Sequence, residues 1–224
     1  PRLVGDLLTP GDLVVLVIPI DEAAPKGRII LPQQQVLRDV LDAHASAVVC
    51  QAEDLPRTLS TLNTPPRIVI TDSQAFGQVS RDTPESVPLT SFSILMARAK
   101  GNLSAIAAGA MAADHLQDGD RILVSEGCTH HRQCGDIGTV KLPAWLKKHS
   151  GRQLEFDFTS GTDFPEQLEQ YAMVVHCGGC MLNTREVRYR YALARSQGVP
   201  MTNYGILIAH MKGILARSIA PFGL

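Results

Sequence analysis

Short, almost entirely apolar runs alternate with segments of helical spacing along this chain, and this alternation constrains the fold more than any other feature. Residues 13–20 suit a strand buried on both faces, and 36–44 have helical spacing. Further strands are expected at 47–50, 67–71, 121–125, 154–158, 172–175 and 200–203, and further helices at 55–62, 94–116, 142–148, 165–171, 184–197 and 205–217. A repeated β-α-β order predicts parallel sheets with right-handed crossovers.

The length of the chain and one interruption of the alternation predict two domains. The 224 residues suffice for one large domain or two small ones. Two prolines within 81–90 interrupt the first alternation, and a second begins near residue 121. We therefore predict an α/β protein of two domains, each with a mainly parallel sheet flanked by helices. The domains are predicted at 1–95 and 96–224, with the boundary inside 95–118.

Charge and hydropathy exclude several classes of partner. The chain has 21 Lys and Arg against 22 Asp and Glu, so its net charge of −1 gives no reason to expect nucleic acid or an anionic membrane. No apolar run approaches the roughly 18 residues of a membrane span, and no signal peptide is evident. Five cysteines, two of them in a CxxC, favour reduced thiols or metal ligands in the cytoplasm over a disulfide framework.

Two short clusters of thiols and imidazoles are the candidate functional residues. They are Cys128-x-His130 and His176-Cys177-Gly-Gly-Cys180, with 45 residues between the two. Each cluster follows an expected strand, so both belong at the carboxyl edge of one sheet, where ligands gather in open α/β folds. Asn183 is a candidate N-cap with Glu186 in capping-box spacing, and the start of that helix would favour thiolate over thiol.

The spacing of the clusters leaves three interpretations open. The first is a structural zinc site of an interaction module. The second is a CxxC thiol–disulfide oxidoreductase. The third is an iron–sulfur cluster held by three thiolates. The third cysteine and the two histidines argue against a dithiol catalyst, which needs neither. Elsewhere, His149 and His210 have no ligand-like spacing and are expected to be surface or core residues.

The two-part motif resembles the signature of HydF, the family of maturation GTPases of [FeFe]-hydrogenases. Similar segments lie elsewhere in the chain, at 11–21 (GDLVVLVIPID), 25–28 (PKGR), 31–35 (LPQQQ) and 200–205 (PMTNYG). The resemblance extends over essentially the whole chain, but only to the dimerisation and cluster-binding parts of the family. Because the chain starts at Pro1 and has no GxxxxGK(S/T) phosphate loop, we expect a piece of a longer protein. GTP would bind only in the missing domain, and we expect no GTP hydrolysis by this chain.

The resemblance implies a cofactor, a cargo and partners. It implies a [4Fe-4S] cluster on Cys128, Cys177 and Cys180, with His130 and His176 as candidates for the fourth ligand or for hydrogen bonds to sulfur. It implies a scaffold that receives a diiron precursor from radical-SAM maturases and passes it to the apo-[FeFe]-hydrogenase. It also implies a homodimer formed through the first domain.

The charge of the C-terminal region suits an anionic cargo. Residues 185–224 contain six basic side chains and one acidic side chain. The diiron precursor with cyanide ligands is anionic, and Arg185, Arg188 and Arg195 lie on roughly one face of the expected helix. We therefore expect these arginines to bind the precursor, although a solvated helix face would have the same composition.

Overall fold

The computed structural model describes residues 2–20, 29–127 and 136–224, and the chain divides into two compact units. The first unit consists of Pro1–Leu95 with Lys212–Leu224, and the second is Met96–Met211. The second domain is predicted to extend to residue 224, whereas Lys212–Leu224 belong to the first unit. Arg217 connects these last residues to that unit, because its guanidinium donates to the carbonyls of Ser80, Thr83 and Pro84 at 2.9, 2.9 and 2.7 Å.

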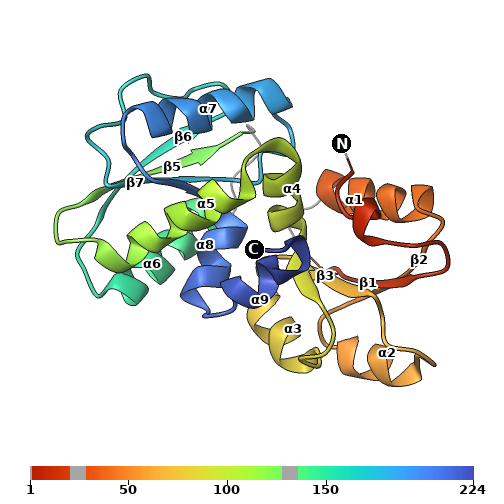
Figure 1. The fold of residues 1–224 in the computed structure, drawn as a ribbon. Coiled ribbons are helices and arrows are strands. Elements are labelled where there is room, and N and C mark those ends of the chain that lie inside the picture. Colours follow the sequence, from red (N-terminus) through yellow and green to blue (C-terminus); the bar gives the residue numbers. More distant parts are fainter. Residues whose placement is uncertain (1, 21–28, 128–135) are drawn as a thin grey trace. The chain divides into compact units, whose positions relative to one another are not determined.

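The first unit is built on a four-stranded parallel sheet in the order β2-β1-β3-β4. Its sheet and flanking helices appear in red to yellow in Figure 1, with α1 on one side and α2 and α3 on the other. The elements are η1 (Gly5–Leu7), β1 (Leu13–Val17), α1 (Leu31–Asp42), β2 (Ser46–Cys50), α2 (Leu55–Thr61), β3 (Ile68–Thr71), α3 (Phe76–Asp82), β4 (Leu89–Ser91), α9 (Leu215–Ile219) and η4 (Ala220–Phe222). Helix α4 (Phe92–Lys100) includes the boundary between the units.

The second unit has its own four-stranded parallel sheet, in the order β6-β5-β7-β8. Helix α7 covers one face of this sheet, and α5, α6 and α8 lie on the other (Figure 1). The elements are α5 (Leu103–Ala110), η2 (Met111–His115), β5 (Arg121–Glu126), the π-helical turn η3 (Ile137–Lys141), α6 (Leu142–Ser150), β6 (Glu155–Ser160), β7 (Met173–His176), α7 (Thr184–Ser196), β8 (Met201–Asn203) and α8 (Tyr204–Met211). The predicted fold class, α/β with two parallel sheets, is confirmed.

Three predicted helices differ from the structure by more than a shift of their ends. The helix expected at 94–116 is split after Lys100, and Asn102 begins α5 by accepting the Ala105 N–H at 3.0 Å. The helix expected at 205–217 ends at Met211. Gly213 has φ of +71°, a left-handed backbone conformation that glycine adopts without strain and that does not continue a helix. The segment 165–171 contains no helix at all. Its apolar residues Leu168 and Tyr171 instead pack into the sheet core beside Leu123 and Val174.

The two sheets repeat one design. In each, the strand order is second, first, third, fourth, and the fourth strand passes directly into a helix. The same pattern of residues marks that passage, PLTSFSIL at 88–95 and PMTNYGIL at 200–207. The registers also correspond, since Thr71 pairs with Val17 in the first sheet as His176 pairs with Ser125 in the second. Asp72 of the first unit therefore occupies the position of Cys177 in the second.

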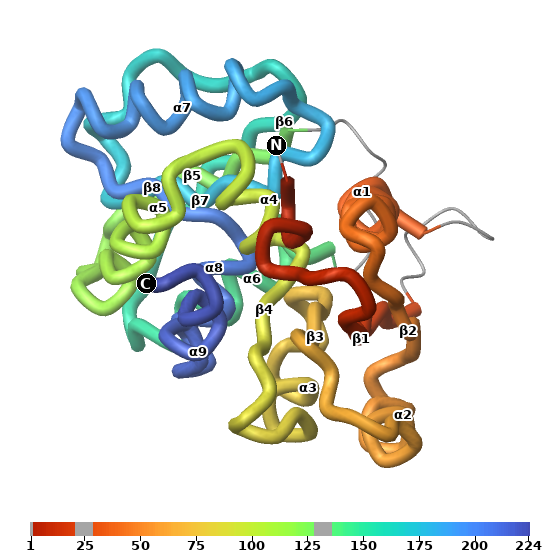
Figure 2. Tube along the Cα trace, turned by 45° about the vertical axis from the view of Figure 1, so that its right-hand side comes forward, coloured from red at the N-terminus to blue at the C-terminus, as the bar shows by residue number. Residues whose placement is uncertain are grey.

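Among the described helices, none is long and apolar enough to cross a lipid bilayer. Figure 2 follows the Cα trace through both units from a second direction.

Candidate functional site

The second sheet has a topological switch point between β5 and β7. From β5 the chain continues to β6 on one side, and β7 then pairs with the other side of β5. Connections leave a switch point in opposite directions, which opens a crevice at the carboxyl ends of the two strands. Gly127 directly follows β5, and Cys177 directly follows β7. The sequence-predicted cysteine pair therefore begins at the position where this fold class binds ligands.

Two backbone N–H groups point at the sulfur of Cys177. The N–H of Gly127 reaches Sγ at 3.0 Å, and that of Gly179 reaches it at 3.3 Å. Burial raises the pKa of the Cys177 thiol, and these two hydrogen bonds act in the opposite direction. Leu182 leaves no space for a side chain at position 127, since a Cβ there would lie 2.7 Å from Leu182 Cγ. The close approach of the two loops therefore depends on glycine.

The ammonium of Lys100 holds the CxxC loop. Its Nζ donates to the carbonyls of Gly179 at 2.7 Å, Cys180 at 3.1 Å and Leu182 at 2.8 Å. Burial lowers the pKa of Lys100, while nearby Cys180 and Cys177 raise it. The lysine thus fixes the backbone around both thiols and brings a positive charge to a place where two thiolates would need one.

Both ring nitrogens of His176 are occupied by protein groups. Nδ1 lies 2.7 Å from the Cys177 carbonyl oxygen, and Nε2 lies 3.1 Å from Nη1 of Arg190. Because arginine can only donate, Nε2 must accept and Nδ1 must carry the proton. Burial lowers the pKa of His176 to about 4, so the ring is neutral at pH 7. In this arrangement His176 orients the first residue of the CxxC and has no free lone pair for a metal ion.

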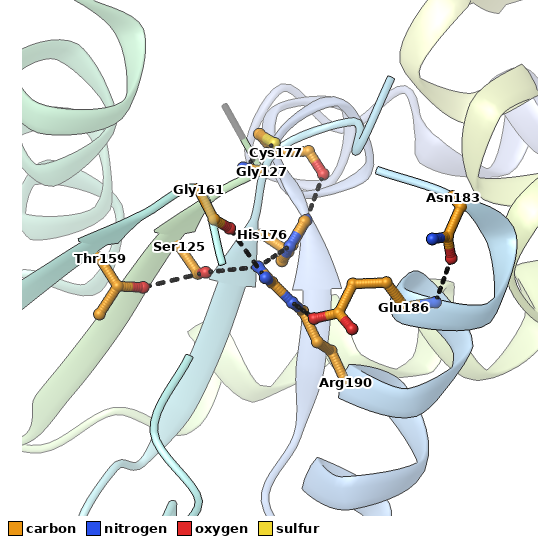
Figure 3. Close-up of polar contacts among 9 residues, drawn as sticks. All are labelled: Ser125, Gly127, Thr159, Gly161, His176, Cys177, Asn183, Glu186 and Arg190. Atoms are coloured by element: carbon orange, nitrogen blue, oxygen red, sulfur yellow. Dashed lines mark hydrogen bonds and ion pairs between the residues drawn. The ribbon is translucent and has the colours of Figure 1, made fainter. Parts of the chain in front are cut away.

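The guanidinium of Arg190 lies at the carboxyl ends of β5, β6 and β7, as Figure 3 shows. Besides His176, its guanidinium donates to Glu186 Oε1 at 2.7 Å and to the Gly161 carbonyl at 2.8 Å, with Ser125 Oγ at 3.4 Å. It also lies 4.8 Å from the centre of the Phe164 ring. The side chain is completely buried. Arg190 therefore joins β5, β7, the loop after β6 and α7 behind the cysteine loop.

The start of α7 differs in one detail from the expected capping box. Asn183 Oδ1 accepts the Glu186 N–H at 2.8 Å, which confirms the predicted N-cap (Figure 3). The Glu186 carboxylate, however, binds Arg190 instead of the N-cap backbone. Cys180 lies four residues before Thr184, the first residue of α7, so the CxxC is a loop ahead of the helix.

A buried carboxylate and a phenol lie beside the same crevice. Glu126, the last residue of β5, is 4% exposed, and Tyr204 Oη lies 3.4 Å from its Oε1. Burial, followed by the nearby charge of Glu126, raises the pKa of Tyr204 well above its ordinary value. Tyr204 therefore stays protonated at neutral pH and can donate to this carboxylate.

The structure brings together part of the predicted site. Cys177, Cys180 and His176 lie at one sheet edge, whereas Cys128 and His130 fall outside the described residues. Arg185, Arg188 and Arg195 are exposed on α7. Sequence reasoning missed two cations, Lys100 and Arg190. A signal for the second exists, because Val187, Arg190 and Ala194 follow the i, i+3, i+7 spacing of a buried helix face. No local signal marks Lys100, which lies 79 residues before Gly179.

The fold and this edge define a class of protein: an α/β protein of two repeated units, the second of which presents a cysteine pair at its switch point. Residues 3–101 match the hydrogen maturase F dimerization domain, and residues 104–221 match the hydrogen maturase F tetramerization domain. The chain therefore belongs to the hydrogen maturase F family, as its sequence motifs predicted.

No curated protein matches the chain. Among solved structures, the shikimate 5-dehydrogenase of Mycobacterium fortuitum aligns over 95% of this chain and 94% of its own, with 10% sequence identity and a TM-score of 0.35.

Proposed function

We propose that this protein is an iron–sulfur scaffold for hydrogenase maturation. Cys128, Cys177 and Cys180 would hold a [4Fe-4S] cluster, and the protein would assemble the diiron precursor of the [FeFe]-hydrogenase active site and deliver it to the apo-enzyme. The carrying observation is the environment of Cys177. Its sulfur lies at the switch point and receives two backbone N–H groups, next to a loop fixed by Lys100.

The chemistry of these donors fits such a cluster. Thiolates are the usual ligands of iron–sulfur clusters, and hydrogen bonds to sulfur tune them. In the chain Gly127, which donates to Cys177, immediately precedes Cys128. Three cysteines would leave one iron of the cluster open to bind the diiron substrate. His176, with both nitrogens engaged, would orient Cys177, which leaves His130 or a ligand from solvent for the fourth position.

Two features disfavour the thiol–disulfide alternative. A reactive CxxC thiol has a lowered pKa at the first turn of a helix. Burial instead raises the pKa of Cys177, and the CxxC ends before α7 begins. A structural zinc site would use the same donor atoms, and the metal and sulfide content of the protein distinguishes it from an iron–sulfur cluster.

The exposed arginines of α7 remain part of the proposal. Arg185, Arg188 and Arg195 would contact the anionic precursor from the solvent side. Replacement of all three arginines by Gln should lower precursor loading; unchanged loading contradicts their role.

The proposal also includes the partners of the protein. Oligomers would form through the regions that match dimerization and tetramerization domains. Radical-SAM maturases would supply the precursor, in the cytoplasm.

The test is the metal content after anaerobic reconstitution. We expect about four irons and four sulfides per chain, and loss of the cluster in Cys128→Ala, Cys177→Ala and Cys180→Ala. Cys50→Ala, which removes a thiol at the end of β2 in the first unit, is the matched control and should retain the full cluster. About one zinc without sulfide would replace the proposal by a structural-zinc module. Delivery is tested by activation of apo-[FeFe]-hydrogenase with precursor-loaded protein.

Lys100 should control the stability of the bound cluster. Lys100→Met removes three hydrogen bonds to the CxxC loop and the positive charge near its thiols. Because groups that support metal ligands typically change affinity by about 10- to 100-fold, we expect at least tenfold faster iron loss to a chelator. Lys148→Met, an exposed change on α6, should leave the rate unchanged. Equal rates for both variants would contradict this role.

A further inference from the structure

Three potential metal ligands from separate segments of the second unit converge at one place. Asp114 comes from η2, His149 from the last turn of α6 and His210 from the last turn of α8. His149 Nε2 lies 2.7 Å from Asp114 Oδ1, and His210 Nε2 lies 3.0 Å from both carboxylate oxygens. We propose that these residues bind a divalent transition-metal ion, and that Zn²⁺ suits them best.

The distances between the donor atoms are close to those of a zinc site. One ligand atom from each residue can be chosen so that all three lie within 4.8 Å of one another. In a tetrahedral site with bonds of about 2.0–2.1 Å, ligand atoms are about 3.3 Å apart. The spacings of 2.7 and 3.0 Å approach this value, so small side-chain rotations would admit an ion. Two imidazoles and one carboxylate would leave the fourth position for water or another donor.

The surroundings hold the two rings in position. The His149 and His210 rings pack edge to face, with centroids 5.7 Å apart. Their side chains are only 26% and 13% exposed, whereas Asp114 is 38% exposed. Both histidines lie at helix C-termini, where the backbone carbonyls carry partial negative charge and favour a cation. Ligands held in this way lose little conformational entropy when they bind an ion.

This site is separate from the cysteine pair. Helices α6 and α8 each follow a strand and run back across the sheet, so their last turns lie at its amino edge. Figure 1 shows α5, α6 and α8 together on the face opposite α7. The cysteine loop follows the carboxyl end of β7. An ion here would join the ends of η2, α6 and α8 and so stabilise the second unit, whether or not the protein carries an iron–sulfur cluster.

The experiment titrates metal into the full chain with Cys128, Cys177 and Cys180 changed to serine, so that those thiols cannot compete. We expect about one Co²⁺ per chain with visible d–d absorption and no sulfur-to-cobalt charge-transfer band, followed by displacement with Zn²⁺. Binding of Zn²⁺ should also raise the thermal midpoint of unfolding. His149→Ala and His210→Ala should each weaken binding at least tenfold, whereas His115→Ala, at the exposed neighbour of Asp114, should not.

Asp114→Asn is the second variant, because it keeps the size of the side chain and its capacity to accept a hydrogen bond. It should also bind Zn²⁺ at least tenfold more weakly and remain folded by circular dichroism. Either of two results overturns the proposal. One is no uptake by the serine variant; the other is an affinity that His149→Ala, His210→Ala and Asp114→Asn leave unchanged. Neither result bears on the proposed cluster, because its cysteines are absent from the experiment.

Discussion

Replacement of Arg190 by alanine is expected to destabilise the second unit by about 3–5 kcal/mol. Removal of one member of a buried charged network usually has an effect of this size. The variant leaves Glu186, His176 and the Gly161 carbonyl without their donor and opens a cavity against Phe164. The effect should therefore combine lost hydrogen bonds with lost packing.

Urea unfolding followed by Trp145 fluorescence measures this effect, because the only tryptophan lies on α6 of the second unit. Arg188→Ala is the matched control. It changes an exposed arginine two residues away on the same helix and should alter the free energy of unfolding by less than about 0.5 kcal/mol. Arg190→Lys keeps the charge but cannot reproduce the planar fork, so it should fall between the two. An Arg190→Ala protein as stable as Arg188→Ala would show that the network contributes nothing.

Replacement of Gly109 by alanine should reverse the usual effect of that change. In an exposed helix, glycine to alanine stabilises by about 1 kcal/mol. Gly109, however, faces the backbone of β8 from within α5, and a Cβ there would overlap the Met201 carbonyl and lie 2.8 Å from its carbon. Because backbone cannot move aside as a flexible side chain can, we expect a loss of about 2–4 kcal/mol.

The same fluorescence measurement applies, with Ala108 as the control position. Ala108 is exposed on α5, and Ala108→Gly should cost only the propensity difference of about 1 kcal/mol. A Gly109→Ala protein that equals or exceeds the parent in stability would contradict the close packing of α5 on β8.

The sequence was informative where a signal is local. The apolar runs at 13–20, 121–125 and 172–175 predicted strands close to β1, β5 and β7, because a parallel sheet buries both faces of its strands. The same runs placed Cys177 correctly at a strand end. Asn183 was recognised as an N-cap because the capping bond extends only three residues, to Glu186.

These local patterns could not predict contacts between residues far apart in the sequence. Lys100 binds a loop 79 residues later, and Asp114 meets His149 and His210 from 35 and 96 residues away. Periodicity describes one element at a time and cannot place side chains from different elements at one point. The apolar residues of 165–171 suggested a helix, yet they pack against the sheet as an irregular segment. There tertiary packing outweighs local propensity.

The repeated strand order gives the chain two sheet edges of the same register, and these edges carry different side chains. Each unit offers a crevice of the same register, but where the second has Cys177 the first has Asp72, which follows Thr71 as Cys177 follows His176. One backbone framework thus accepts a carboxylate in one copy and a thiol in the other. A chain with two such frameworks can therefore place different chemical groups at the same position of each sheet.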